Sequence, residues 1–332
     1  MPPLSRVLLT DRAWPDTAIE REILSAAGAE LIEPAAIDEA TLAAAAATVD
    51  AILTNWARVS GTVIRSAGRC RVICRTGIGL DNIDVATATR LNIPVTNVPD
   101  YCITEVADHA LALLLACARQ VAFFHRRTKQ GEYSLKAAHP MPRLTGKILG
   151  LVGLGRIGRC LAERARALGM QIVATTASGS SHGVDCQIVS LENLLCVSDF
   201  VSLHAPLTTA TRRLLGLPQF ERMKPTAYLV NTSRGGLIDP AALATALDRG
   251  LIAGAALDVF DPEPPDLSLP LYQDERVIVT PHAAFVSVES LIELRTRTAR
   301  QVVDVLQGRR PESVVNPEVY LAQPTALNRK SI

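Results

Sequence analysis

Short apolar runs alternate with longer stretches of mixed polar and apolar residues along most of the chain. Such runs, each followed by a helical stretch, are typical of buried strands in parallel sheets whose crossover helices cover both faces. The pattern therefore predicts an α/β fold. The predicted strands are Val7–Thr10, Ala51–Thr54, Val72–Cys74, Ile148–Val152, Ile172–Ala174, Phe200–His204, Tyr228–Asn231, Gly254–Val259 and Val277–Thr280.

A turn-rich phrase, Asn97-Val98-Pro99-Asp100, ends the first series of strands. After it we predict a helix capped by Thr104, with Glu105 and Asp108 in its first turns, where their charges suit the helix dipole. Its continuation, Ala110–Ala118, is the most apolar segment but is far shorter than the roughly 20 residues of a membrane-spanning helix. We therefore expect a buried helix that leads into a second domain.

The segment 123–147 differs from this pattern, because it is polar, contains two prolines and has no clear periodicity. It is interpreted either as a linker or as an extended arm that packs on a partner subunit. The residues alone leave both possibilities open.

Composition narrows the class of protein. With 332 residues, of which 48% are hydrophobic, the chain is long enough for two domains with cores of their own. The 34 basic and 33 acidic residues almost cancel, so no charge excess favours nucleic acid or an anionic membrane as a partner. A small-molecule partner is the expectation.

Seven cysteines are scattered along the chain without a C-x-x-C pair, which is typical of free thiols in a reducing compartment. The N-terminal segment meets Asp11 and Arg12 before any apolar stretch reaches the length of a signal peptide. We therefore expect a cytoplasmic protein. No His/Cys spacing matches a zinc site, so no metal is expected either.

A glycine-rich turn follows the predicted strand Ile148–Val152 and precedes a helical stretch. In it Gly153 permits a tight turn, Gly155 lets backbone amides approach a pyrophosphate, and Gly158 allows close packing of helix on strand. The motif G-x-G-x-x-G is weak alone, but here a strand, a helix and a second strand surround it as a dinucleotide site requires. We predict that NAD(P) binds here.

The residue expected to bind the adenosine ribose differs from the usual pattern. An acidic residue roughly 20 positions after the glycines normally bonds the ribose hydroxyls, but Thr176 occupies that place. A carboxylate would repel a 2′-phosphate, so its absence removes one barrier to NADP. No arginine or lysine stands nearby to attract the phosphate, so the coenzyme is left open with a slight preference for NADP.

Three later phrases contain residue types suited to acid–base chemistry on a carboxylate substrate. Arg234 follows a predicted strand and precedes two glycines, and its guanidinium can hold a carboxylate with two hydrogen bonds. His282, if it lies near a carboxylate such as Glu263, can donate a proton near neutral pH. Spacing alone does not show that Glu263 and His282 touch. No comparable motif surrounds the other histidines: His204 is interpreted as structural or cleft-lining, and His109, His125, His139 and His182 as structural or solvated.

Five phrases in this order, GLGRIGR, SDFVSLHAPLT, LVNTSRGGLID, GAALDVFDPEP and TPHAAF, resemble the D-isomer-specific 2-hydroxyacid dehydrogenases. The resemblance extends to RTGIGLDNID and NVP earlier in the chain and covers all but about the last fifteen residues. It implies hydride transfer between NAD(P)H and a small 2-oxo acid or D-2-hydroxy acid.

The resemblance also implies a role for each site residue. Arg234 would hold the substrate carboxylate, His282 would be the acid–base group, and Glu263 would orient and charge it. The implied coenzyme contacts, besides the glycines and Thr176, are Asp258 at the nicotinamide carboxamide, Arg156 and Ile157 at the pyrophosphate, and Ala205, Pro206 and Thr232 along the cleft. The implied substrate contacts in the other domain are the amides of Gly77 and Ile78, with Arg75 close by.

The same resemblance implies two doubly wound parallel-sheet domains, a Rossmann coenzyme domain inserted in a flavodoxin-like substrate domain. The substrate (catalytic) domain would combine residues 1–99 and 287–332, and the dinucleotide-binding domain would span 100–286. Members are typically dimers joined through the coenzyme domain, so a homodimer is expected.

Two questions stay open at this stage. The phrases around Tyr101 and His282 are also similar to the C-terminal binding proteins, so a dinucleotide-sensing scaffold with little turnover is the alternative to an enzyme. The substrate is the second question: phosphoglycerate members have an arginine where this chain has Thr54-Asn55-Trp56, which disfavours 3-phosphoglycerate and favours an uncharged or aromatic side chain. Tyr101 and Trp56 could each belong to the core or to the pocket.

Overall fold

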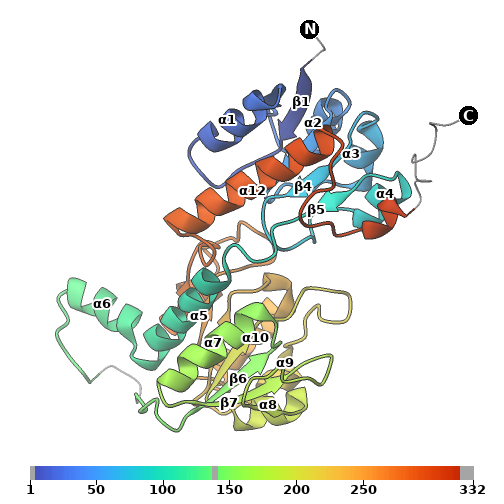
Figure 1. Cartoon of the computed structure of the whole chain (residues 1–332). Helices are drawn as coiled ribbons and strands as arrows, with labels where there is room; N and C mark the ends of the chain where they lie inside the picture. Colours follow the sequence, from blue (N-terminus) through green and yellow to red (C-terminus); the bar gives the residue numbers. More distant parts are fainter. Residues whose placement is uncertain (1–3, 137–140, 322–332) are drawn as a thin grey trace, which may run out of the picture. The chain divides into compact units, whose positions relative to one another are not determined.

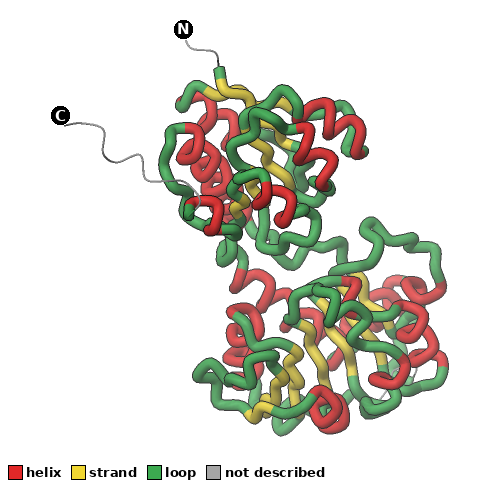
Figure 2. Tube along the Cα trace, turned by 90° about the vertical axis from the view of Figure 1, so that its right-hand side faces the viewer, coloured by secondary structure: helices red, strands yellow, loops and turns green. Residues whose placement is uncertain are grey.

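The structure is a computed structural model that describes residues 4–136 and 141–321. It divides into two compact units, Met1–Tyr101 with Ser287–Ile332 (unit 1) and Cys102–Val286 (unit 2). The predicted division was 1–99 with 287–332 and 100–286, and the two observed units divide after Tyr101 and after Val286. In each unit helices flank a parallel sheet (Figure 2), which confirms the predicted α/β class.

The described part of unit 1 contains a five-stranded parallel sheet with the strand order β2-β1-β3-β4-β5. This is the flavodoxin-like order of a doubly wound sheet. The strands are β1 (Ser5–Leu9), β2 (Ala29–Ile32), β3 (Ala51–Thr54), β4 (Ile73–Arg75) and β5 (Val95–Thr96). The helices are α1 (Ala18–Ala26), α2 (Glu39–Ala46), α3 (Gly61–Ser66), α4 (Val85–Arg90), α12 (Val288–Leu306) and a 3₁₀ turn at Pro317–Tyr320.

Successive side chains of the unit 1 strands enter two different cores, because side chains alternate across a strand. Val7 and Leu9 pack toward α1 and α12, whereas Leu8 packs toward α2 and α3. Helices α1 and α12 lie side by side on one face of this sheet although they come from opposite ends of the chain (Figure 1).

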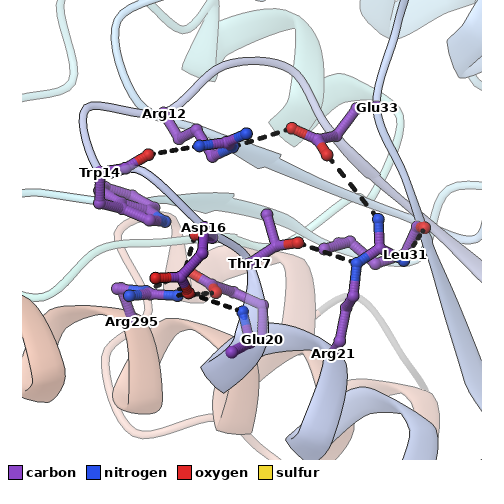
Figure 3. Close-up of polar contacts among 10 residues, drawn as sticks. Arg12, Trp14, Asp16, Thr17, Glu20, Arg21, Leu31, Glu33 and Arg295 are labelled. Atoms are coloured by element: carbon purple, nitrogen blue, oxygen red, sulfur yellow. Dashed lines mark hydrogen bonds and ion pairs between the residues drawn. The ribbon is translucent and has the colours of Figure 1, made fainter.

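A buried ion pair joins these two helices. Arg295 of α12 donates to both carboxylate oxygens of Glu20 in α1 at 2.8 Å and to Asp16 at 2.9 Å, and its guanidinium lies over the ring of Trp14 (Figure 3). Because Glu20 is only 2% exposed, removing Arg295 would leave a buried carboxylate unpaired, which is far costlier than losing a surface pair. This contact explains why the last helix belongs to unit 1.

The described part of unit 2 contains a seven-stranded parallel sheet in the order β12-β11-β10-β9-β6-β7-β8. The strand order reverses between β6 and β9, which is where dinucleotides bind in doubly wound folds. The strands are β6 (Ile148–Val152), β7 (Gln171–Thr175), β8 (Gln187–Ile188), β9 (Phe200–Leu203), β10 (Tyr228–Asn231), β11 (Gly254–Leu257) and β12 (Val277–Val279). The helices are α5 (Ile103–Ala118), α6 (Val121–Lys129), α7 (Arg156–Ala167), α8 (Leu191–Val197), α9 (Leu217–Phe220), α10 (Pro240–Asp248) and α11 (Pro270–Gln273), with a 3₁₀ turn at Gly235–Leu237.

Two apolar layers enclose the unit 2 sheet. Helices α5 and α7 cover one face, where Leu114 and Leu161 pack on Leu151 of β6. Helices α8, α9 and α10 cover the other face, where Phe220 and Leu247 belong to the second core. The carboxyl ends of all these parallel strands therefore form one edge that the helices leave accessible to loops.

Three short strands, β2, β5 and β8, were not predicted, because an isolated two- to four-residue run carries too little periodicity to be distinguished from a loop. The predicted cap Thr104 is wrong. The helix begins two residues earlier than predicted, at Ile103 with Cys102 as its N-cap, and the Thr104 hydroxyl donates to Glu105 instead.

The prediction for helix α6 is also corrected, because residues 123–129 lie in a segment that was interpreted as a linker or an extended arm. None of its residues is buried, so burial in the core does not account for this helix. Charge stabilises it instead: Arg126 and Arg127 pair with Glu275 at 2.9 and 2.7 Å, and Arg127 lies over the Phe123 ring. Residues 137–140, later in the same segment, lie outside the described residues.

The described residues contain no single helix that is long and apolar enough to cross a membrane. Only the pair formed by Ile103–Ala118 and Val121–Lys129 meets the length and composition criteria together, and it is bent by 63°. Its first helix is largely buried in the core of unit 2.

Candidate active site

Most of the predicted site residues lie at the carboxyl edge of the unit 2 sheet. The glycine turn follows β6, Thr176 follows β7, and Ala205 follows β9 shortly after its end. Arg234, Glu263 and His282 come after β10, β11 and β12, which are paired neighbours. Parallel pairing therefore gathers residues that are far apart in sequence at one edge.

The glycine turn has the geometry expected of a dinucleotide loop. Gly153 has a φ of +97°, and a β-carbon there would lie 2.7 Å from the carbonyl oxygen of His204. At Gly158 a β-carbon would lie 2.5 Å from the carbonyl oxygen of Gly153, so the helix can approach the strand only without a side chain. Around Gly155, the N-cap of α7, no described atom lies within 4 Å of a β-carbon. The N-terminus of α7 is therefore open to an anion, with Arg156 and Ile157 as its first two residues.

Thr176 directly follows β7 and begins a polar loop. Its hydroxyl donates to the carbonyl oxygen of Ser180 at 3.3 Å, and Ser178 is exposed. The described part of the loop thus presents hydroxyls and backbone groups where many dinucleotide sites have a carboxylate.

The residues that follow β9 pack closely against the glycine turn at Gly153. Ala205 is half-buried, and its carbonyl oxygen accepts a bond from the Ser233 hydroxyl at 2.7 Å. Pro206 is exposed, and its carbonyl oxygen accepts from Thr211. His204 contacts the Ser202 hydroxyl at 2.9 Å, and burial lowers the pKa of its imidazole to about 4. The imidazole is therefore neutral near pH 7, and of its two predicted roles, structural or cleft-lining, the contact with Ser202 favours the structural one.

Thr232 supplies an observation that points to a ligand. It directly follows β10 and is only 8% exposed, yet its hydroxyl has no hydrogen-bond partner among the described residues. A buried hydroxyl without a partner costs free energy, so such groups are commonly satisfied by a ligand or water. Together with the open N-terminus of α7, it shows that the residues present fit a dinucleotide.

Arg234 is held by the backbone around it. The side-chain amide of Asn231 donates to the Arg234 carbonyl oxygen at 2.8 Å, and Arg234 Nη1 donates to the carbonyl oxygen of Ser233 at 2.7 Å. The next residue, Gly235, is packed so closely on the backbone of Phe260 that a β-carbon would overlap it. The loops carrying Arg234 and Glu263 are thereby fixed to each other.

His282 and Glu263 are in contact. Nδ1 of His282 lies 2.8 Å from Oε2 of Glu263, while Oε1 of Glu263 accepts from the backbone amide of Phe260 at 2.8 Å. A carboxylate only accepts, so Nδ1 carries a proton and Nε2 is the ring nitrogen left to exchange one. Both side chains remain partly exposed, at 22% and 32%.

Asp258 is fully buried and binds the backbone around His282. Its carboxylate accepts from the Thr280 hydroxyl at 2.5 Å and from the amides of Ala283 and Ala284 at 2.9 Å, and its carbonyl oxygen accepts from the His282 amide. Burial raises the pKa of the Asp258 carboxyl, but bonds from His109, Thr280 and the two amides outweigh it and leave the pKa below its ordinary value. The carboxylate is thus ionised in the folded protein.

The three substrate residues predicted in unit 1 also gather at strand ends. Arg75 ends β4 and donates to Asn55 Oδ1 at 3.2 Å, and its guanidinium packs on Gly77, whose φ is +151°. The carbonyl oxygen of Ile78 accepts from Asn97 at 2.9 Å. Within the described residues, Asn55 Nδ2 and the Thr76 hydroxyl are buried without a hydrogen-bond partner. The role of this group in substrate binding stays a prediction.

Comparison with known proteins decides the family. The family described as D-isomer specific 2-hydroxyacid dehydrogenase, NAD binding domain, matches residues 111–284, all within unit 2. The chain belongs to the D-isomer-specific 2-hydroxyacid dehydrogenases. It is similar to glyoxylate reductase of Korarchaeum cryptofilum, with 41% identity over 80% of this chain and 82% of that protein. It is also similar to D-3-phosphoglycerate dehydrogenase of Methanocaldococcus jannaschii, with 41% identity over 80% of this chain and 51% of that longer one.

A solved relative has the same fold over almost the full length. This is an NADPH-dependent glyoxylate/hydroxypyruvate reductase of Sinorhizobium meliloti, with a TM-score of 0.84, 28% identity and coverage of 99% of both chains. The prediction of an NAD(P)-dependent dehydrogenase that transfers hydride between small 2-oxo and 2-hydroxy acids is confirmed. This D-2-hydroxyacid dehydrogenase therefore binds a nicotinamide dinucleotide.

The contacts of one residue near the site were not predicted from the sequence. His109, interpreted as structural or solvated, has its Nε2 atom 3.1 Å from the Thr280 hydroxyl and 3.5 Å from Asp258 Oδ1. No motif could have indicated this, because Thr280 lies 171 residues further along the chain. The exposed residues His125 and His182 lie on α6 and in the loop after β7, and His139 lies outside the described residues. No group of three or more metal-ligating side chains occurs in residues 4–136 and 141–321.

Proposed function

We propose that this enzyme reduces a small 2-oxo acid that carries no charge besides its carboxylate, with glyoxylate as the first candidate, and that Arg234, His282 and Glu263 form its catalytic group. The observation that carries the proposal is the 2.8 Å contact between His282 Nδ1 and Glu263 at the sheet edge shared with Arg234 and the glycine turn.

His282 acts as the proton donor. Glu263 accepts from Nδ1–H, which orients the ring and stabilises its protonated form, so that Nε2–H is available to a substrate carbonyl oxygen. When bound, the nicotinamide supplies the hydride to the carbonyl carbon. His282 then needs a proton from solvent before the next turnover, and its partial exposure supports that exchange.

Arg234 binds the substrate carboxylate. Its guanidinium offers two parallel N–H donors. Its movement is limited because the Arg234 carbonyl oxygen accepts from the Asn231 side chain and Nη1 donates to the Ser233 carbonyl oxygen. A carboxylate fixed in this way holds the adjacent carbonyl carbon in one orientation, which limits hydride delivery to one face.

The residues at the end of β3 favour a small 2-oxo acid with no charge besides its carboxylate. Thr54 and Asn55 are buried and carry no charge, and the next residue is Trp56. The arginine that phosphoglycerate members of the family have at the end of this strand is absent, so 3-phosphoglycerate stays disfavoured. Relatives named glyoxylate reductase, at 37–41% identity over most of their length, favour glyoxylate.

NADPH is proposed as the preferred coenzyme. Thr176 and the exposed Ser178 provide hydroxyls for a 2′-phosphate, and the place after β7 lacks the carboxylate that would repel it. The Sinorhizobium relative, whose described activity is NADPH-dependent, favours the same choice.

A homodimer and a cytoplasmic location complete the proposal. Tyr133 and Leu135, in the segment after α6, are 95% and 80% exposed, and apolar side chains in such a segment favour burial against a second copy. The described cysteines are all free, which favours a reducing compartment.

The test is a spectrophotometric screen of the purified enzyme with NADPH and NADH against glyoxylate, hydroxypyruvate, pyruvate, phenylpyruvate and 3-phosphohydroxypyruvate. The highest kcat/KM is expected with glyoxylate and NADPH, and His282→Ala should lose nearly all turnover. Preference for the phosphorylated acid, or an active His282→Ala, would overturn the proposal.

A further inference from the structure

His109 lies on α5, and its ring reaches the loop that carries His282. Nε2 of His109 is 3.1 Å from the Thr280 hydroxyl, and Thr280 is the first residue after β12. The imidazole is 25% exposed, whereas the carboxylate of Asp258, 3.5 Å away, is fully buried. The contact therefore connects a helix on one face of the sheet with the edge where the site lies.

The direction of each hydrogen bond follows from the available protons. Asp258 is ionised and can only accept, so the single proton of the Thr280 hydroxyl is donated to Asp258 Oδ1 at 2.5 Å. Thr280 must then accept from His109, so Nε2 of His109 carries a proton. Both the Nε2–H tautomer and the imidazolium satisfy this condition, so the arrangement does not depend on the charge of His109.

His109, Thr280 and Asp258 thus form a hydrogen-bonded relay, and its last member, Asp258, contacts the backbone around His282. The Asp258 carboxylate accepts from the amides of Ala283 and Ala284, which follow His282 directly. His282 itself has a φ of +54°, a conformation that costs a non-glycine residue free energy and persists only when its surroundings impose it. The bonds to Asp258 on both sides of His282 provide that constraint.

We propose that His109 is a positioning residue of the reductase: its Nε2–H holds the Thr280 hydroxyl toward Asp258, and Asp258 holds the 280–284 backbone so that His282 presents Nε2 to the substrate. The inference rests on the proposed role of His282 as proton donor. It adds a residue outside the group formed by Arg234, Glu263 and His282.

Two substitutions separate hydrogen bonding from packing. His109→Gln places an amide N–H donor near the position of Nε2, whereas His109→Leu keeps a similar volume without a donor. We expect His109→Leu to lower kcat about tenfold, the equivalent of about 1.4 kcal/mol in the barrier, with a much smaller change in the KM for glyoxylate. His109→Gln should restore most of kcat.

A second pair tests the same relay from Thr280. Thr280→Val removes the hydroxyl at nearly constant shape, and Thr280→Ser keeps it. Adding His109→Leu to Thr280→Val should cause little further loss, because the bond that His109 donates is already gone. This pair also decides the matter if the His109 variants do not fold.

Crystal structures of His109→Leu and His109→Gln provide a readout apart from turnover. In His109→Leu the Thr280 side chain should rotate and His282 should leave its positive φ, and in His109→Gln both should stay. If the wild-type enzyme reduces no 2-oxo acid, the proposed function fails and these structures alone test the relay. Equal kcat values for the Leu and Gln variants, additive losses with Thr280→Val, or an unmoved 280–284 segment in His109→Leu would overturn the inference.

Discussion

Gly235 and Phe260 are packed backbone against backbone, and a β-carbon on Gly235 would overlap the carbonyl group of Phe260. Gly235 follows Arg234 directly, and the amide of Phe260 donates to Glu263. This contact therefore sets the spacing between the loop that carries Arg234 and the loop that carries Glu263.

Gly235→Ala should consequently impair both folding and catalysis. The added methyl must displace rigid backbone, and overpacking of this kind costs typically about 1–3 kcal/mol. We expect a lower Tm and a kcat/KM reduced at least tenfold. Gly236→Ala is the matched control, because its β-carbon would meet only the ends of the Asp261 and Leu207 side chains at 3.0 Å, which can move. Equal effects at both glycines would contradict the argument.

Arg234→Lys tests the geometry of carboxylate binding at constant charge. An ammonium cannot reproduce two parallel hydrogen bonds, so kcat/KM should fall at least tenfold, or by about 1.4 kcal/mol. Steady-state kinetics with glyoxylate measure the loss, and dinucleotide affinity should change little. Unchanged kinetics would exclude Arg234 from the site.

Glu263→Gln tests the pairing with His282. The amide keeps the size of the side chain but removes the negative charge, so the protonated imidazole becomes less stable. The basic limb of the reduction rate should therefore move to lower pH, while His282→Ala should abolish turnover and leave dinucleotide binding largely intact. A pH profile that does not move would mean that the 2.8 Å contact has no role in the reaction.

Which parts of this site could be foreseen depends on how local their signals are. The roles of Gly153 and Gly158 follow from a short motif between a strand and a helix, and the close approaches that require glycine are present at both. The contact between Glu263 and His282 needed the pairing of β11 with β12, which no spacing in the sequence reveals. His109 was missed for the same reason, because its partners are distant in the chain.

Element ends were the least predictable part of the fold. The central strands of both sheets contain continuous apolar runs and were predicted, whereas β8 consists of only Gln187 and Ile188 at the sheet edge. The error at Thr104 has a local cause: threonine favours N-cap positions, but here its hydroxyl is used by Glu105.

Thr176→Asp tests the coenzyme preference. The new carboxylate should bond the ribose hydroxyls of NADH and repel the 2′-phosphate of NADPH, so the ratio of kcat/KM values should shift toward NADH. Thr176→Asn is the control, because it offers a similar shape without charge. A native enzyme that strongly prefers NADH would mean that another group holds the ribose.

His204 makes the stability of unit 2 depend on pH. Burial lowers the pKa of its imidazole from 6.5 to about 4, so the unfolded chain binds a proton in this window that the folded protein does not. The contribution of His204 to the free energy of unfolding is therefore complete above pH 6.5. It is lost as the pH falls toward 4, by about 1.4 kcal/mol per pH unit and about 3 kcal/mol in total. His204→Gln removes the titrating group and keeps a polar side chain that can bond Ser202.

The variant should lose less of its free energy of unfolding between pH 7 and pH 4.5 than the wild-type protein, by about 2 kcal/mol. Urea denaturation at several pH values measures this difference, with exposed His182 changed to Gln as the matched control. Because His204 lies directly under Gly153, the same protonation should weaken dinucleotide binding as the pH falls, and His204→Gln should reduce that loss. Parallel stability curves for His204→Gln and the wild-type protein would show that the imidazole is protonated equally in the folded and unfolded states, contrary to its buried environment.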